Sequence, residues 1–180
     1  MKKIAIDTEA DRAPIIYNNG GCSMDVRMAN HNDIDMLRKA RFDYFAAENW
    51  ELTDEKRYLI SSQLQQYYSK HLNHDFFAAF IKDEGGNIIS VAFMVIFEKP
   101  ANLSFPTGKT GMILNVLTYP EYRKKGYATN TMGLLIEEAK KQDLSFIELS
   151  ASNLGKSLYK KLGFQELKPS HFTEMKMSLI

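Results

Sequence analysis

Several features that would place a protein outside the soluble, globular class are scarce or missing in this sequence of 180 residues. Cys22 is the only cysteine, so no disulfide can form within the chain, which fits a reducing compartment. No uncharged stretch approaches the length of a membrane span. Asp7 and Glu9 interrupt the first apolar residues, so the sequence predicts no signal peptide. The formal net charge of +1 gives no general attraction to nucleic acid or to a membrane. We therefore expect a cytoplasmic protein without a membrane partner.

Several catalytic and binding motifs are also absent. A Walker loop requires G-x-x-x-x-G-K-[ST] and a dinucleotide site requires G-x-G-x-x-G, and the sequence contains neither. No nucleophile elbow indicates a Ser/His/Asp triad. His71 and His74 have the spacing of a metal pair, but no cysteine or third histidine stands nearby, so we expect no metal site. The basic residues after Tyr122 are not continued by a stripe of basic and aromatic residues, so we expect no nucleic-acid partner.

The most informative stretch is 112–129, where an apolar strand is followed by a basic turn and a helix. The apolar run stops at Pro120, which has no N–H to give to a sheet. After the turn, apolar residues recur at the spacing of one helical face, at Ala128, Met132, Leu135 and Ala139. The sequence therefore predicts a strand, a basic turn that contains Gly126, and the start of a helix in direct succession.

This helix start is a natural anion site. The first turn of a helix leaves backbone N–H groups unpaired, and the helix dipole favours negative charge there. Gly126 lets a phosphate approach the backbone without a Cβ in the way, while Arg123, Lys124 and Lys125 add positive charge. A plainer alternative is a basic turn that only caps the helix.

The predicted elements indicate one α/β domain with a mixed sheet, in the order β-α-α-β-β-β-α-β-α-β-β. The predicted strands are 24–28, 76–82, 88–97, 112–117, 146–150, 164–167 and 174–179. The predicted helices are 30–47, 54–72, the one that opens after the basic turn, and 155–162. We place the domain at 24–180 and treat 1–23 as an N-terminal extension of unknown role.

Two motifs in the second half of the chain resemble those of the GNAT N-acetyltransferase superfamily. The basic turn reads R-x-x-G-x-A from Arg123 to Ala128, which is similar to the family's acyl-CoA pyrophosphate loop, (Q/R)-x-x-G-x-(G/A). About thirty residues downstream, 152–164 is similar to the signature N-x-x-A-x-x-L-Y-x-x-x-G-F, with L-Y and G-F in register. Ser152 stands where Asn is common and Gly155 where Ala is common. The resemblance extends over roughly 24–180, and the predicted element order also matches this fold.

The resemblance implies an acetyl-CoA site along the central strand. The backbone of Leu117 and Thr118 would pair with the pantetheine arm, and the Thr118 N–H would point to the thioester carbonyl as an oxyanion donor. Ser152 and the neighbouring Asn153 would bind pantetheine amides through their side chains. The pyrophosphate would be held by the loop and helix start, at Arg123, Lys124, Lys125, Gly126, Tyr127, Ala128 and Thr129.

Tyr159 is the residue we expect to act as the general acid. When an amine attacks a thioester, the sulfur leaves as a thiolate, and a nearby phenol can protonate it. The alternative is an ordinary half-buried helix tyrosine, one of nine tyrosines in the chain. The spacing of Tyr159 to the G-F pair and to the upstream loop favours the catalytic role.

The acceptor side is predicted less sharply. The first two helices are rich in aromatic residues, and we expect a few of them, with Phe45 as a candidate, to line a pocket. These residues are Phe42, Tyr44, Phe45, Trp50, Tyr58, Tyr67 and Tyr68. Asp43, Glu48 or Glu51 would match the charge of an amine. Asn115 on the central strand can position the acceptor or a water molecule but cannot take a proton. Many members of the superfamily place a glutamate on this strand as the base, and 113–116 contains no carboxylate. Glu98, Glu148, Asp43 and His171 are the other candidate bases.

These observations predict an acetyl-CoA-dependent N-acetyltransferase that acts by direct attack in a ternary complex. The acceptor would be a small-molecule amine or a protein amino group, and the resemblance makes a homodimer possible. One alternative is a non-catalytic module of the same fold that binds CoA as a sensor or as part of a larger assembly. A second alternative is a nucleotide-phosphate binder that uses the same loop.

Overall fold

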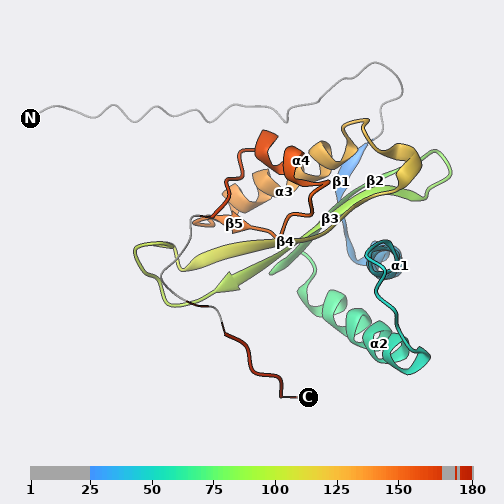
Figure 1. Ribbon diagram of the computed structural model, residues 1–180, viewed down its shortest axis with the longest axis horizontal. Helices are drawn as coiled ribbons and strands as arrows, with labels where there is room; N and C mark the ends of the chain where they lie inside the picture. Colours follow the sequence, from blue (N-terminus) through green and yellow to red (C-terminus); the bar gives the residue numbers. More distant parts are fainter. Residues whose placement is uncertain (1–24, 168–172, 174, 180) are drawn as a thin grey trace, which may run out of the picture.

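The computed structural model describes residues 25–167, 173 and 175–179 (Figure 1). Within these residues, five strands form one sheet in the order β1-β2-β3-β4-β5. Neighbouring strands are antiparallel, except that β4 and β5 run parallel. The strands are β1 (Val26–Met28), β2 (Phe76–Lys82), β3 (Ile88–Glu98), β4 (Lys109–Thr118) and β5 (Ile147–Glu148). The α-helices are α1 (Ile34–Ala47), α2 (Asp54–His71), α3 (Tyr127–Lys141) and α4 (Lys156–Lys161).

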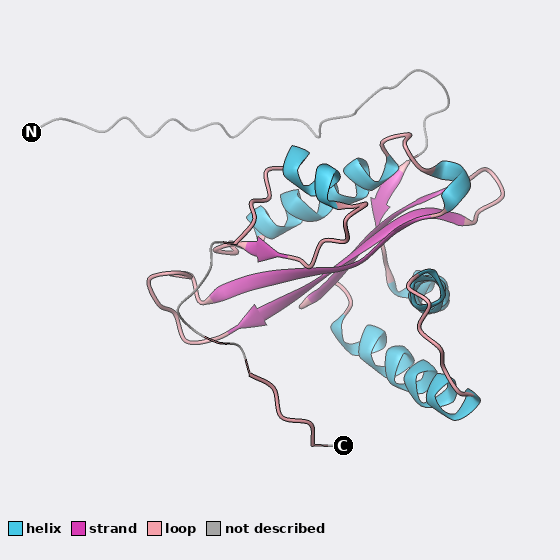
Figure 2. Ribbon diagram, in the orientation of Figure 1, coloured by secondary structure: helices cyan, strands magenta, loops and turns pink. Residues whose placement is uncertain are grey.

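Helices cover both faces of the sheet. Figures 1 and 2 show α1 and α2 on one side and α3 and α4 on the other. The alternation of β2 explains this arrangement, because Phe76 and Phe80 belong to the core under α1 and α2 while Phe77 and Ala79 belong to the core under α3. The predicted mixed α/β sheet flanked by helices is confirmed.

Local signals fix most of the element bounds. The β2 strand has the predicted bounds, and β3 extends one residue beyond them. The Thr53 hydroxyl caps α2 by accepting a hydrogen bond from the N–H of Lys56 at 3.3 Å. Among the described helices, none combines the length and the apolar character of a membrane span.

The two predicted closing strands are wrong. Residues 164–167, 173 and 175–179 form no strand, while residue 174 lies outside the described residues. The β5 strand has only two residues, so it offers almost no edge for another strand to pair with. Figure 1 shows 175–179 running away from the sheet. The alternating apolar side chains there are 80% exposed or more, at Met175, Met177 and Leu179. The predicted extension, 1–23, lies outside the described residues.

Asp33 is a buried carboxylate that ties β1 to the start of α1. Arg27 donates to it through Nη1 at 2.8 Å and Nη2 at 2.7 Å, and the N–H of Asn30 donates at 2.9 Å. Burial by itself raises the pKa of Asp33, but the hydrogen bonds from Arg27 and Asn30 outweigh burial and hold the pKa below its usual value.

We expect Asp33→Asn to lower the free energy of unfolding by about 2 kcal/mol at neutral pH, because Arg27 loses its charged partner. Since the native pKa lies below the unfolded value, this contribution is present above the unfolded pKa and is lost as the pH falls through the native pKa. Urea unfolding at neutral and at acidic pH measures both effects. Asp35→Asn is the control, because the Asp35 side chain is 89% exposed. Equal stability of the two variants at neutral pH would contradict the prediction.

Candidate active site

The central strand β4 is paired on both sides only along its first half. Gly111 and Met112 pair with Ile147 and Glu148 of β5, and the Gly111 N–H donates to the Phe146 carbonyl at 3.0 Å. Beyond Met112, no strand among the described residues pairs with β4 on the β5 side. The edge of β4 from 113 to 118 therefore has backbone groups without a strand partner, of which the Thr118 carbonyl is bound by Arg123 Nε at 3.0 Å.

A β-bulge interrupts this edge at Asn115. The register on β3 moves from Phe93↔Leu114 to Val91↔Leu117, so β4 contains one extra residue there. Asn115 has a φ of 55°, a left-handed conformation that asparagine adopts more readily than most residues. The bulge turns the Asn115 side chain toward α1, where its Nδ2 donates to the Ala40 carbonyl at 3.5 Å.

The bulge also decides which amides of β4 face the free edge. The Tyr119 N–H donates to the Ile89 carbonyl of β3 at 3.1 Å, so this amide faces β3. Because amides alternate along a strand, the N–H groups of Thr118 and Val116 face the opposite side, where β5 has ended. The same alternation turns the Leu117 amide toward β3. The N–H groups of Thr118 and Val116 are therefore candidates for contact with a ligand at the free edge. The roles predicted for Thr118 and Leu117 stay predictions.

The helix start after the basic turn is open. Gly126 precedes α3 with a φ of 84°, no side chain caps the helix, and an added Cβ at Gly126 would meet no atom within 4 Å. Among the described residues, none accepts a hydrogen bond from the amides of 124–129. A row of unpaired amides at a helix start with no capping side chain fits an anionic group such as a diphosphate.

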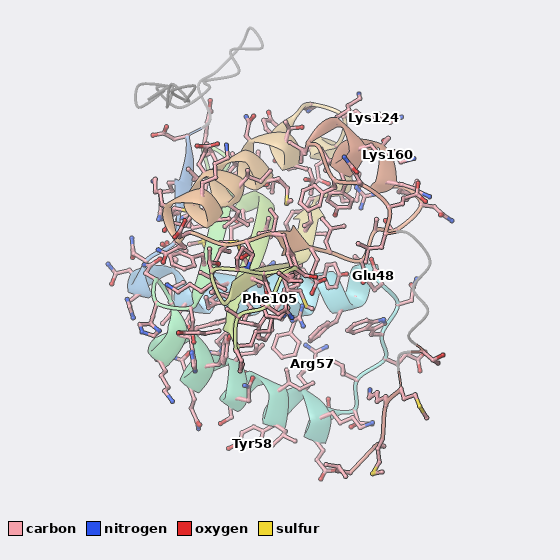
Figure 3. The ribbon with its side chains drawn as sticks, turned by 90° about the vertical axis from the view of Figure 1, so that its left-hand side faces the viewer. Glu48, Arg57, Tyr58, Phe105, Lys124 and Lys160 are labelled. Atoms are coloured by element: carbon pink, nitrogen blue, oxygen red, sulfur yellow. The ribbon has the colours of Figure 1, made fainter. Side chains whose placement is uncertain are left out.

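Basic side chains surround this helix start. Arg123 Nε donates to the Thr118 carbonyl at 3.0 Å, which joins the turn to the end of β4. Lys125 Nζ lies 5.5 Å from the centre of the Tyr122 ring. In Figure 3, Lys124 from the turn and Lys160 from α4 both lie in the upper right of the molecule, and Lys160 is paired with Glu166 at 2.8 Å. The turn therefore combines a fixed backbone with cations that remain available to a phosphate.

Tyr159 lies on α4 and packs against the same core cluster as Val116 of β4. Its ring makes an edge contact with Phe164, with the two centres 6.0 Å apart. A Cβ added to Gly155 would lie 2.8 Å from Tyr159 Cε2, so glycine at this position lets the ring pack against the start of α4. Burial raises the pKa of the Tyr159 phenol, and the nearby Tyr44 raises this pKa further, so the phenol stays protonated at neutral pH.

The other predicted residues are placed as follows. Ser152 and Asn153 are exposed in the turn before α4, and the Ser152 Oγ accepts from the Gly155 N–H at 3.2 Å. Phe45 is buried and stacks on Trp50, with ring centres 5.3 Å apart. Because Phe45 is 6% exposed, little of its side chain is open to an acceptor, and its predicted contact with one stays a prediction.

Asp43 already has two partners. Lys39 Nζ lies 2.6 Å from its carboxylate, and the Tyr119 hydroxyl donates to the same oxygen at 2.5 Å. Burial and this hydrogen bond raise the pKa of Tyr119 above its ordinary value. Lys39 and Tyr119 also line a cleft of about 430 Å³ between α1 and the β2–β3 turn. Asp43 thus joins α1 to Tyr119. Because its carboxylate is already bound by Lys39 and Tyr119, it is not free to match the charge of an acceptor amine.

The sequence analysis assigned no role to Arg41 or Val116, and it named Tyr44 only as one of the aromatic residues of the first two helices. Arg41 Nη1 donates to Asn115 Oδ1 at 3.3 Å, so α1 meets the β4 bulge at this point. Tyr44 lies close enough to Tyr159 for its charge to affect the pKa of that phenol. One signal was available, because Arg41 is a basic residue among the aromatic residues that were expected to be buried in the first helix.

Comparison with known proteins agrees with this geometry. The profile of the acetyltransferase (GNAT) family matches residues 34–164, so the chain belongs to this family. A predicted acetyltransferase from Clostridium acetobutylicum, solved with acetyl-CoA, is 30% identical with a TM-score of 0.73, over 86% of this chain and 96% of that one. No curated protein matches the chain at a significant level.

Two more distant structures share the fold. The glucosamine-6-phosphate N-acetyltransferase of Arabidopsis thaliana is 19% identical with a TM-score of 0.60, over 86% of this chain and 99% of that chain. The aminoglycoside N-acetyltransferase AAC(6')-Iy in complex with CoA is 14% identical with a TM-score of 0.63, over 88% of this chain and 99% of that chain. Membership of this family indicates that the chain is an acyltransferase and that acetyl-CoA is its cosubstrate.

Proposed function

We propose that this protein transfers the acetyl group of acetyl-CoA to a primary amine by direct attack in a ternary complex. The strongest support is the open start of α3, where the amides of 124–129 have no acceptor among the described residues. The free edge of β4 lies directly upstream in the chain, and Tyr159 packs against the same core cluster as that strand. Diphosphate, pantetheine arm and thioester thus each have a candidate place.

In the proposed reaction, the amine nitrogen adds to the thioester carbonyl carbon. The N–H of Thr118, with Val116 beside it, stabilises the oxyanion that forms, because fixed dipoles need no reorganisation as the charge develops. The C–S bond then breaks, and the sulfur takes the proton of the Tyr159 phenol. The nitrogen still carries two protons after the attack, and it loses one of them to water, which leaves a neutral amide. The phenolate of Tyr159 is reprotonated from solvent. The products are an N-acetylated amine and free CoA.

One observation favours a second candidate function. The β4 strand contains no aspartate or glutamate, so no carboxylate on the central strand can accept the proton of an ammonium group. An alkyl ammonium has an unperturbed pKa of roughly 10, so it rarely loses this proton at neutral pH without help. A module that binds CoA without turnover would need no such base.

Release of free CoA thiol with a panel of amines distinguishes the two candidates. We expect amine-dependent release above the rate of thioester hydrolysis, together with saturable binding of acetyl-CoA by calorimetry. Binding without amine-dependent release would favour the sensor. If ATP displaces acetyl-CoA as well as CoA does, the loop is a general phosphate site and the proposal fails. A cytoplasmic location, a homodimer and a protein amino group as acceptor stay predictions.

A further inference from the structure

Arg41 is a half-buried cation without an acidic partner. Its guanidinium lies 4.7 Å from the centre of the Phe45 ring and 5.9 Å from that of Tyr44. Its one hydrogen bond among the described residues goes to a neutral group, Asn115 Oδ1, at 3.3 Å. Burial lowers the pKa of Arg41, and the only groups that oppose this shift are two tyrosines, Tyr68 and Tyr44. No described carboxylate therefore neutralises this charge.

The neighbouring arginines are different. Arg27 is paired with Asp33 at 2.7 Å, and Arg38, one helical turn before Arg41, is paired with Asp35 at 2.8 Å. Removing a charge from water costs free energy unless an opposite charge compensates. A guanidinium that is kept partly buried without a partner, beside a candidate active site, fits a group that awaits an anionic ligand.

Arg41 contacts β4 next to the strand edge that is proposed to hold the thioester. Its partner Asn115 is directly followed by Val116, whose N–H faces the free edge of β4. Adjacent residues of a strand are about 3.3 Å apart, so Arg41 contacts β4 one residue away from an amide of the free edge. Tyr44, which borders the Arg41 guanidinium, also raises the pKa of Tyr159 through its charge when it is ionised.

We propose that Arg41 binds a carboxylate of the acceptor, and that the acceptor is a primary amine of the amino-acid type, with the amine and the carboxylate a few bonds apart. This inference rests on the proposed function. A single guanidinium matches one carboxylate through two parallel hydrogen bonds. A phosphate dianion would need a second cation, and the nearby Lys39 is already paired with Asp43. The rings of Tyr44 and Phe45 favour an apolar or aromatic side chain on the acceptor.

The test uses the full chain and matched acceptors. Thiol release is measured with the standard L-amino acids, with their amides, and with phenethylamine, which is phenylalanine without its carboxylate. For wild type, we expect kcat/KM to be at least ~10-fold higher for the acid than for the amide, as expected when a buried charge loses its partner. Arg41→Met keeps the length and the packing of the stem, and it should remove this preference mainly through KM. Arg41→Lys keeps the charge but not the fork, so it should restore part of the preference.

Arg57→Met is the control, because Arg57 also stacks on a ring, Phe42 at 5.1 Å, but belongs to the exposed start of α2.

Binding of an N-acetylated product provides a readout that does not need turnover. With CoA present, N-acetyl-L-phenylalanine should raise the melting temperature of wild type, while N-acetylphenethylamine should not. Should Arg41→Met fail to fold, the comparison of acid with amide on wild type still tests the inference.

The outcomes separate the two proposals. Equal activity on acids and amides, unchanged in Arg41→Met, would overturn the carboxylate site while the acetyltransferase stands. No turnover on any amine, with carboxylate-dependent binding that Arg41→Met abolishes, would support the site and contradict the proposed catalysis. Neither turnover nor carboxylate-dependent binding would overturn the inference.

Discussion

Tyr159→Phe is expected to lower kcat by about 100-fold or more, the usual contribution of a positioned general acid. Phenylalanine keeps the ring, its packing against the core cluster with Val116 and its edge contact with Phe164, so the fold and the affinity for acetyl-CoA should change little. Steady-state kinetics with calorimetric binding of acetyl-CoA checks both statements. Tyr58→Phe is the control, because Tyr58 is 79% exposed on α2 and should leave kcat unchanged.

The pH dependence gives an independent readout of the same residue. Burial and the neighbouring Tyr44 raise the pKa of Tyr159 above the ordinary phenol value of about 10. The acid form therefore persists through neutral and mildly alkaline pH, and kcat should fall only as the pH rises through this raised pKa. The alkaline fall should be absent in Tyr159→Phe. A wild-type kcat equal to that of the variant would remove Tyr159 from the mechanism.

Gly126→Val is expected to raise the dissociation constant of acetyl-CoA by at least ~10-fold, because a β-branched residue at positive φ costs roughly 1–3 kcal/mol and displaces the amides of the turn. Gly126 has a φ of 84° and directly precedes α3. At saturating acetyl-CoA, kcat should change less than affinity, since Thr118 and Tyr159 lie outside the turn. Calorimetry of acetyl-CoA binding measures the effect.

Gly86→Val is a matched control for this prediction. Gly86 has a φ of 83°, and an added Cβ there would also meet no atom within 4 Å. The two substitutions therefore introduce similar backbone strain, one in the β2–β3 turn and the other at the α3 start. We expect similar losses in melting temperature but a loss of affinity only in Gly126→Val. Equal affinities of the two variants would show that the turn does not hold the diphosphate.

Much of the fold could be predicted because its signals are local. Thr53 caps α2, and the nearly continuous apolar runs of β2 and β3 specify strands that bury both faces. The closing strands could not be predicted in the same way, because alternation at Met175 and Met177 predicts an extended segment but not a partner for it. A two-residue β5 provides no such partner among the described residues.

The candidate site shows the same division. The motifs that contain Gly126 and Tyr159 predicted two segments for an acetyl-CoA site, and the structure shows that the helix after Gly126 has an open start. The sequence could not predict the bulge at Asn115, since a φ of 55° on one strand residue depends on its neighbours in the sheet. Nor could it predict that Asp43 would be bound by Tyr119 while Arg41 would meet the neutral Asn115, because both facts depend on contacts between distant segments.

The most direct test of the central claim is a titration of the isotope-labelled protein with CoA, followed through its backbone amide resonances. The claim is that the amides at the start of α3 and along the free edge of β4 bind the diphosphate and the pantetheine arm. We expect the largest shifts at Gly126, Tyr127 and Ala128, and at Val116 and Thr118. Shifts confined to the cleft beside Tyr119 and Asn87, with the start of α3 unchanged, would contradict it.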